Sequence, residues 1–275
     1  MVRISQALKV SRSSLYYQPV KPNQDLKLAI KIQDIHENVD DTLGHRKLAP
    51  LLGVGKNKVS RVMRLHQIQA RRKKKKYVYP GQASQIFPNL ARQTQGAGEK
   101  QPPVIASDIF EFRLADQSKV YGCFALDEQG KQLLSLVFDY WMTSQLVQQT
   151  IINIPKSFTV GNAVIKHLWH SDQGKQYSAE ITKTLLKMRG LTGSMSRAGT
   201  PTDNPFAERF VGLFKLAVVE KQKYYNLGEL LKQAQKWINF YNQARPHQSL
   251  GQIPPVRYAR QHGLPTVSTI SLLTV

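Results

Sequence analysis

Two different periods of apolar residues divide the chain. Between residues 26 and 39, apolar positions recur every three or four residues, which predicts an amphipathic helix. Two further helices are expected at 44–52 and 58–65, with a glycine-containing turn between them. Beyond Pro103 the spacing becomes that of strands. The sequence therefore predicts a small helical region followed by a domain of a different class.

The region after residue 103 predicts a layered α/β domain. We expect strands at 104–114, 120–126, 132–138, 164–170 and 191–195, and helices at 144–152, 178–189, 204–221 and 227–242. The first three strands are joined by short polar turns, which is typical of an antiparallel meander. The later strands alternate with helices, which favours a sheet covered by helices. Prolines at 246, 254 and 255 predict an irregular tail after the last helix.

The remaining segments have distinct compositions. Residues 4–17 place two short helical stretches around a polar turn, a rhythm typical of a helix-turn-helix. Arg71–Lys76 is a run of six basic side chains, which stays solvated until phosphates neutralise it. The stretch 79–103 contains prolines and glycines without a sustained period, so we place the domain boundary there. The predicted units are a partial helix-turn-helix (1–18), a helical domain with a basic tail (24–76), a linker (77–103), a core domain (104–225) and a C-terminal helix and tail (226–275).

Net charge narrows the class of partner. Lys and Arg together number 39 against 18 Asp and Glu, which gives a formal net charge of +21 and a pI near 10.1. Such a charge favours a polyanion, and nucleic acid is the first candidate. An anionic membrane is the alternative, but no apolar run approaches the roughly 20 residues of a spanning helix, and the N-terminus lacks a signal-like apolar core. We expect a cytoplasmic protein without membrane contact.

A basic helix and the charge run supply the candidate DNA contacts. The helix at 58–65 follows a tight turn and carries Lys58, Arg61 and Arg64, a pattern that suggests a recognition helix for the major groove. An ordinary solvated helix has the same pattern, so this assignment is a hypothesis. Within the basic run, the candidates for phosphate contacts are Arg71, Arg72, Lys73 and Lys74.

Three carboxylates occupy positions from which they can converge. Phosphodiester transfer is served by two divalent ions roughly 3.5–4 Å apart, which prefer oxygen ligands. Asp108 lies within the apolar first strand, where a carboxylate is costly unless a basic side chain or an ion faces it. Asp172 follows a strand end, where ligands gather, although a plain turn has the same sequence. Glu208 lies one turn into a helix whose start is marked by Asn204 as N-cap and Pro205 as first residue.

Several sequence runs surround these acids. They are His170-Ser171-Asp172-Gln173-Gly174, Ser194-Met195-Ser196-Arg197-Ala198-Gly199, Asp203-Asn204-Pro205-Phe206-Ala207-Glu208, Lys215, Tyr241-Asn242-Gln243-Ala244-Arg245-Pro246-His247 and Leu250. Together they resemble the IS3-type insertion-sequence transposases of the retroviral integrase superfamily. The 35 positions from 173 to 207 match the spacing of the last two acids in that superfamily's DDE triad. Residues 1–17 and 26–72 resemble the family's helix-turn-helix regions, and 104–258 its catalytic core and C-terminal extension.

The resemblance implies a fold, an activity and site residues. The implied fold is a ribonuclease-H-like (integrase core) mixed sheet with flanking helices, preceded by a small all-α helix-turn-helix region. Asp108, Asp172 and Glu208 would ligate two Mg²⁺ or Mn²⁺ ions, and Lys215 would contact the transposon end. The implied reaction is DNA strand cleavage followed by transfer of the 3′ hydroxyl. The implied partners are transposon-end and target DNA at the nucleoid, further copies of the chain, and the product of an upstream reading frame.

Some site assignments stay open at the level of sequence. Residues 106–111 lack the aromatic and threonine neighbours that the family usually places around its first acid, so Asp127 is the alternative first acid, with Asp139 less favoured. His170 is a candidate for orienting a ligand or touching the scissile phosphate, and we expect Asn204 to support the site in the same way.

Other residues and functions have simpler readings. Arg245 is a candidate DNA contact from the C-terminal motif, which also has the composition of a packing segment. The single Cys123 excludes intrachain disulfides and a zinc site of several cysteines, and we expect it to fill space in a strand. An inactive DNA-binding regulator would have the same charge, and a nuclease on the same core would cut without joining. The complete set of acids at the right spacing favours a transposase over both.

Overall fold

The computed structural model describes most of the chain. The described residues are 22–72, 87–93, 102–159, 167–197, 203–268, 270 and 272–274. The predicted helix-turn-helix at 1–18, the basic residues Lys73 and Lys74, and most of the predicted linker lie outside them. Within the described ranges, no helix is both long and apolar enough to cross a membrane.

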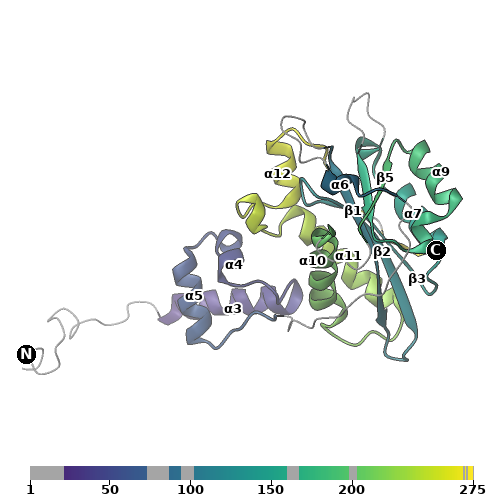
Figure 1. Cartoon of the computed structure of the whole chain (residues 1–275). Coiled ribbons are helices and arrows are strands. Elements are labelled where there is room, and N and C mark those ends of the chain that lie inside the picture. The colour runs from purple at the N-terminus through teal and green to yellow at the C-terminus, as the bar shows by residue number, and fades with distance from the viewer. Residues whose placement is uncertain are drawn as a thin grey trace, which may run out of the picture.

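Three helices form a small domain at the N-terminal end of the described chain (Figure 1). They are α3 (Pro22–Asn38), α4 (His45–Leu52) and α5 (Lys56–Leu65). Their apolar faces meet in a core of Leu28, Ile32, Leu43, Leu48, Val59 and Val62. The turn between α4 and α5 places Gly53 at a φ of 62°, a left-handed conformation that favours glycine. The three helices and the glycine turn that the sequence predicts are confirmed.

A mixed sheet forms the centre of the second domain. Its strands are β1 (Val104–Arg113), β2 (Lys119–Asp127), β3 (Leu133–Asp139), β4 (Leu168–Ser171), β5 (Thr192–Met195) and β6 (Leu273–Thr274), in the order β5-β4-β1-β2-β3-β6. The meander β1-β2-β3 is antiparallel, whereas β4 pairs parallel with β1, and β5 parallel with β4. This arrangement is the predicted ribonuclease-H-like sheet with flanking helices.

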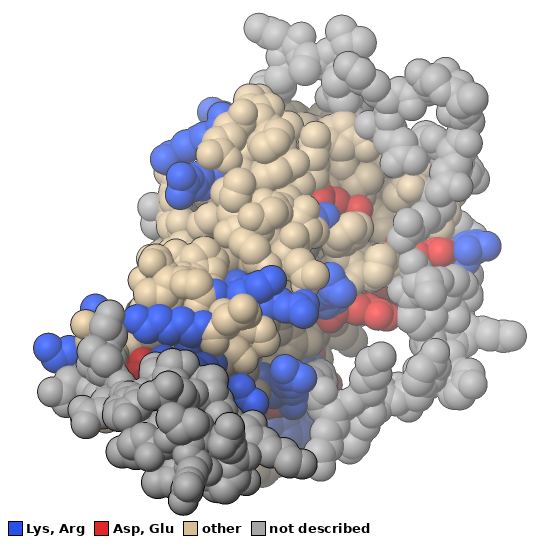
Figure 2. Space-filling model, turned by 90° about the vertical axis from the view of Figure 1, so that its left-hand side faces the viewer, with Lys and Arg blue, Asp and Glu red and all other residues tan. Residues whose placement is uncertain are grey.

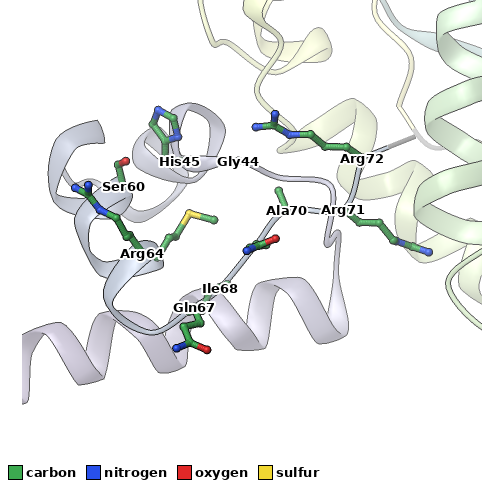
Figure 3. Close-up of a pocket in the computed structure, with 11 residues that line it drawn as sticks. Gly44, His45, Ser60, Arg64, Gln67, Ile68, Ala70, Arg71 and Arg72 are labelled. Atoms are coloured by element: carbon green, nitrogen blue, oxygen red, sulfur yellow. The ribbon is translucent and has the colours of Figure 1, made fainter. Parts of the chain in front are cut away.

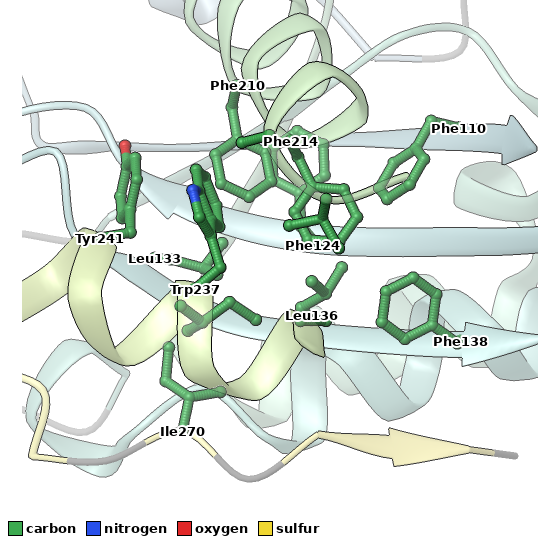
Figure 4. Close-up of a cluster of buried hydrophobic side chains, with 14 of the residues drawn as sticks. Phe110, Phe124, Leu133, Leu136, Phe138, Phe210, Phe214, Trp237, Tyr241 and Ile270 are labelled. Carbon is green, nitrogen blue, oxygen red and sulfur yellow. The ribbon is translucent and has the colours of Figure 1, made fainter. Parts of the chain in front are cut away.

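Helices cover both faces of the sheet. On one face lie α7 (Ser144–Ile152), α8 (Lys175–Ser178) and α9 (Glu180–Met188), and on the other α10 (Pro205–Phe214) and α11 (Leu227–Gln243). Because strand side chains alternate, Phe110, Phe124 and Phe138 pack towards α10 and α11 (Figure 4). Cys123 lies on the opposite face, fully buried in β2, as the sequence predicts.

Three predicted elements differ from the structure. The helix expected at 178–189 is interrupted at Ala179 and becomes α8 and α9. The helix expected at 204–221 changes after Phe214 into a π-helix, Lys215–Val219. The predicted irregular tail contains α12 (Pro255–Gln261), which begins with Pro255 as its first residue, and the edge strand β6. Proline breaks a helix only from within, and at the first position it favours one, which is why this helix was missed.

Part of the predicted linker packs on the core instead. Residues 87–93 include the short helix α6 (Leu90–Gln93), which lies beside β4 and β5. Asn89 donates a hydrogen bond to the Asp203 carboxylate (2.9 Å), and the N–H of Ala91 donates to the Ser194 hydroxyl (3.3 Å). The linker prediction is therefore wrong for this segment, which holds Asp203, two residues before the start of α10.

Buried charges join the helical domain to the core domain. Arg245, which follows α11, donates to the carboxylate of Asp40 at 2.9 Å, and both side chains are almost fully buried. Arg71 pairs with Asp41 at 3.0 Å and also donates to the carbonyl oxygens of Leu216 and Glu220. The assignment of Arg245 to DNA is wrong because its guanidinium is buried and neutralised. Arg71 likewise binds the protein itself, which leaves no basis for assigning it to DNA.

We expect the buried Arg245–Asp40 pair to stabilise the fold strongly. Removing the guanidinium in Arg245→Met leaves the Asp40 carboxylate buried without its partner. The expected cost is about 3–5 kcal/mol in the free energy of unfolding, measured by urea denaturation. In the matched control, Lys183→Met removes an ion pair with the exposed Glu180 and should leave the unfolding midpoint nearly unchanged. Equal effects of the two changes would contradict this interpretation.

Candidate active site and nucleic-acid interface

Asp108, within β1, and Asp172, just past the end of β4, lie at the same level of the sheet. Asp108 pairs in register with Phe124, so its side chain lies on the face of the sheet that α10 covers. The parallel register of β1 and β4 sets Ala106 against His170, which brings Asp172, just past the end of β4, to the level of Asp108. The Asp172 carboxylate is solvent-accessible and accepts the N–H of Gly174 at 3.1 Å.

Glu208 approaches from the helix that covers this face. It lies in the first turn of α10 and is exposed to solvent. The start of α10 is fixed to β1 because the Asn204 amide donates to the carbonyl oxygen of Ser107 at 3.0 Å. Asn204 stands at the N-cap position, as predicted, but its side chain makes no capping hydrogen bond. Its amide instead ties the helix to the residue immediately before Asp108.

The three carboxylates share one electrostatic environment. Burial raises the pKa of Asp108 to about 7, and the negative charge of Asp172 adds to this rise. Glu208 contributes in the same direction, whereas Lys215 opposes it. Partial burial also raises the pKa values of Asp172 and Glu208. Repulsion of this kind is relieved by a cation, so the donor set fits hard divalent ions.

The carboxylates are neighbours rather than a closed metal cage. Among the described residues, no three His, Cys, Asp or Glu side chains lie close enough to hold a single ion.

The alternative first acids have other partners. The Asp127 carboxylate accepts the N–H groups of Gln129 (3.1 Å) and Gly130 (2.7 Å) and so holds the turn between β2 and β3. Burial raises the pKa of Asp127, and the positive charge of Lys131 opposes this rise. Asp139 accepts the N–H of Trp141 at 3.2 Å. Asp108, by contrast, has its pKa raised by the charges of Asp172 and Glu208.

His170 supports the site from the protein interior. It is fully buried, with Nδ1 at 2.9 Å from the Ser194 hydroxyl and Nε2 at 3.2 Å from the carbonyl oxygen of Asp203. The expectation that it touches a phosphate is wrong because no solvent reaches it. The Asp203 carboxylate in turn pairs with Arg197, at 3.1 Å from its Nε. Sequence reasoning missed Asp203, although an acid directly before the N-cap Asn204 was the available signal.

Basic side chains of the helical domain face solvent beside a large pocket. Lys58 and Arg64 of α5 are exposed, whereas Arg61 is held by Asp25 at 2.7 Å and so has its charge neutralised. A pocket of about 1020 Å³ opens next to α5. Figure 3 shows Arg64 and Arg72 on opposite sides of it, with Arg71 pointing away towards the core. Arg61 is therefore a weaker candidate for DNA than Arg64.

Positive charge also borders the carboxylates. The Lys215 ammonium lies 5.9 Å from the ring centroid of Phe110 and lowers the pKa of Asp108. Figure 2 shows Lys and Arg side chains in a band across the middle of one face, with Asp and Glu side chains beside one end of the band. An acidic site next to a basic surface suits a polyanion that reacts at the acids.

Comparisons with known sequences find an integrase family match and relatives from insertion elements. Residues 189–255 match the integrase core domain family. The chain is 26% identical to the candidate transposase InsK of insertion sequence IS150 from Escherichia coli K12, covering 95% of this chain and 94% of that protein. It is 26% identical to a 31 kDa protein of insertion element IS600 from Shigella sonnei, covering 94% and 97%.

Solved structures give weaker matches. The chain is similar to one in a simian T-cell lymphotropic virus intasome with a PP2A regulatory subunit, at a TM-score of 0.49 and 12% identity over 87% of this chain and 77% of that chain. The HTLV-2 integrase catalytic core domain in complex with magnesium matches at a TM-score of 0.39 and 15% identity over 54% and 90%. The family match and the sequence relatives confirm the predicted resemblance to IS3-type transposases of the integrase superfamily.

We expect Asp108 to weaken the metal-free fold at neutral pH. Its folded pKa of about 7 exceeds the ordinary 3.8, so the folded state holds the proton more tightly. This contribution to stability is present below pH 3.8 and is lost as pH rises through about 7. Asp108→Asn should therefore stabilise the chelator-treated protein at pH 8 by about 1–3 kcal/mol, because each tenfold change in proton affinity is worth about 1.4 kcal/mol.

Thermal or urea unfolding of the same variant across pH measures this effect. The exposed Glu37 on α3 provides the control, and Glu37→Gln should leave the pH profile unchanged. A profile of Asp108→Asn that superimposes on that of the unmodified protein would rule out the raised pKa.

Proposed function

We propose that the chain is a DNA transposase whose catalytic carboxylates are Asp108, Asp172 and Glu208. The observation that carries this proposal is their convergence from β1, the end of β4 and α10 into one electrostatic environment. Their order along the chain and the 35 residues between the last two match the triad of the integrase superfamily. A regulator derived from a transposase would have no need to keep this set of acids together.

The proposed chemistry is two successive phosphoryl transfers. Two bound Mg²⁺ or Mn²⁺ ions would stabilise the attacking and leaving oxygens of an in-line displacement. In the first transfer a water oxygen attacks the phosphorus at the transposon end, and the bond to the 3′ oxygen breaks, which leaves a 3′ hydroxyl. In the second, that hydroxyl attacks a phosphodiester of the target, whose own 3′ oxygen departs. In the first step one proton of the water passes to the departing 3′ oxygen, and the other leaves with the new 5′ phosphate and is released to solvent. In the second step the proton of the attacking hydroxyl passes to the departing oxygen of the target.

In this proposal the protein positions the ions and neutralises a phosphate of the bound DNA. The three carboxylates hold the ions, and the Asn204 bond to Ser107 keeps α10 at a fixed height above β1. Lys215 lies close enough to act on Asp108 and would neutralise a phosphate of the bound end. His170 acts indirectly, by holding the backbone of Asp203 just before α10.

DNA binding by the helical domain completes the proposal. The exposed Lys58 and Arg64 lie on α5, the second helix of an α4-turn-α5 pair, where a recognition helix is expected. Arg72 and the basic run after it would contact phosphates. Two copies of the chain on paired ends, with an upstream reading-frame product, would form the working assembly at the nucleoid.

Removing one carboxylate should abolish joining but not binding. We expect Asp172→Ala and Glu208→Ala to lose strand transfer in magnesium, because each removes an ion ligand, while binding to the ends remains. The assay incubates labelled DNA from the flanks of the chain's own gene with protein and magnesium and measures end-joined products.

The first acid is tested in the same assay. Asp108→Asn should abolish transfer, whereas Asp127→Asn should retain it, because Asp127 holds the turn between β2 and β3 and an amide oxygen can still accept the N–H of Gly130. Retained transfer in the Asp172 or Asp108 variants would sink the catalytic assignment. End binding without transfer by the unmodified protein would instead favour the regulator.

The recognition helix makes a separate prediction. Arg64→Ala should weaken binding to the transposon end about tenfold relative to unrelated DNA, because a base contact in the major groove is lost. Competition gel shifts measure this ratio. Lys27→Ala, on the exposed side of α3, is the matched control. Equal weakening for end and unrelated DNA would show that Arg64 contacts only phosphates.

A further inference from the structure

A pocket of about 450 Å³ lies where the helical domain, the core and the C-terminal extension meet. Besides Arg245, which Asp40 neutralises, its basic side chains come from three separate elements: Lys47 from α4, Lys131 from the turn between β2 and β3, and Arg209 from α10. Phe206 and His247 contribute to the rest of the wall. Neither the sequence motifs nor the proposed catalytic site accounts for this convergence of cations.

Of the three basic side chains, Lys131 is attracted by the carboxylates of Glu128 and Asp127, whereas Lys47 and Arg209 lie without such a partner of their own among the described residues. Burial lowers the pKa of Lys47 to about 8, and the charges of Arg245 and Arg209 lower it further. Asp40 attracts Lys47, but its carboxylate is already bound by Arg245 at 2.9 Å. Among the described residues, neither Lys47 nor Arg209 forms an ion pair. Like charges held together in this way create a site for an external anion.

Phe206 and His247 complete the wall of the pocket around the basic side chains. The Lys131 ammonium lies 3.5 Å from the ring centroid of Phe206, which holds it over the wall, and its backbone takes a left-handed φ of 57°. The His247 ring has a buried Nε2 without a hydrogen-bond partner. Its pKa is lowered to about 2, first by burial and then by Arg245, so the ring is neutral.

We propose that this pocket, formed by Lys47, Lys131 and Arg209, binds a phosphate of the DNA backbone. The proposal rests on the proposed transposase function for the identity of the ligand. A backbone phosphate fits better than a free anion because Arg209 directly follows Glu208 on α10, so the pocket and the carboxylates lie on adjoining sides of one helix. A DNA strand that reacts at the carboxylates therefore passes close to the pocket.

The pocket also spans two domains. Lys47 belongs to the helical domain, whereas Lys131 and Arg209 belong to the core, so one phosphate would contact both. Phosphate contacts fix the position and register of a nucleic acid without reading its sequence. The three cations are therefore positioning residues that align bound DNA with the carboxylates.

Salt dependence of DNA binding tests the proposal. The probe is a labelled duplex carrying the end of the chain's own element, bound without divalent metal so that no cleavage occurs. The slope of log K against log salt counts the phosphates that the protein neutralises, so it should become shallower by about 0.9 in Lys47→Gln and in Arg209→Gln. The double variant should show no larger change, because the cations contact the same phosphate. Lys47→Arg and Arg209→Lys retain the charge and should restore the slope.

The control lies on the other face of the sheet. Lys187 is exposed on α9, and Lys187→Gln should leave the slope unchanged. Titration with inorganic phosphate distinguishes the source of the anion. Phosphate binding that Lys47→Gln abolishes, combined with an unchanged DNA slope, would overturn the proposal in favour of a free-phosphate site. An unchanged slope without phosphate binding would overturn it outright.

The DNA-binding test of the pocket does not depend on whether the protein is catalytically active. If the slopes fall as expected but the unmodified protein joins no ends in magnesium, the pocket stands and the transposase activity fails. If ends are joined while the slopes of the Lys47 and Arg209 variants stay unchanged, the pocket proposal fails alone.

Discussion

The burial of the Asp108 carboxylate beside two other acids is the constraint on which the proposed site depends. Burial and the charge of Asp172 raise the pKa of Asp108 to about 7, and Glu208 adds to the same effect. Acids in such a position cost the fold free energy, so the surrounding protein must hold them in place. Aromatic packing of Phe110, Phe124 and Phe210 beneath α10 provides one part of that support.

Hydrogen bonds provide the other part. The Asn204 amide links α10 to β1, and His170 links β4 to the residue before Asn204. Each of the three carboxylates is thus attached to an element that a neighbouring element restrains. The polar groups that serve this purpose are buried, where a hydrogen bond without water competition holds its geometry well. Asp172 and Glu208 face solvent, whereas His170 and Asn204, which position their elements, are buried.

Local patterns predicted the fold well, and long-range pairings were the part that sequence could not supply. Alternation and turns indicated β1, β2 and β3, and the motif around Asp172 and Glu208 pointed to the acids. Arg245 was misassigned because a basic residue in a polar motif has the same sequence whether it faces DNA or a buried carboxylate. Its partner, Asp40, lies 205 positions away. The cationic pocket was missed for the same reason, since its members lie on α4, a strand turn and α10.

The attachment of Arg71 to the π-helix has a consequence for where a cut falls. Arg71 donates to the carbonyl oxygens of Leu216 and Glu220, at the two ends of the widened turn that follows α10. The chain that follows α5 is thereby attached directly to the chain that follows α10. If α5 binds the transposon end as proposed, this attachment would fix the number of base pairs between the sequence that α5 contacts and the phosphodiester at the carboxylates. The position of the cleavage would then be set by the junction between the two domains.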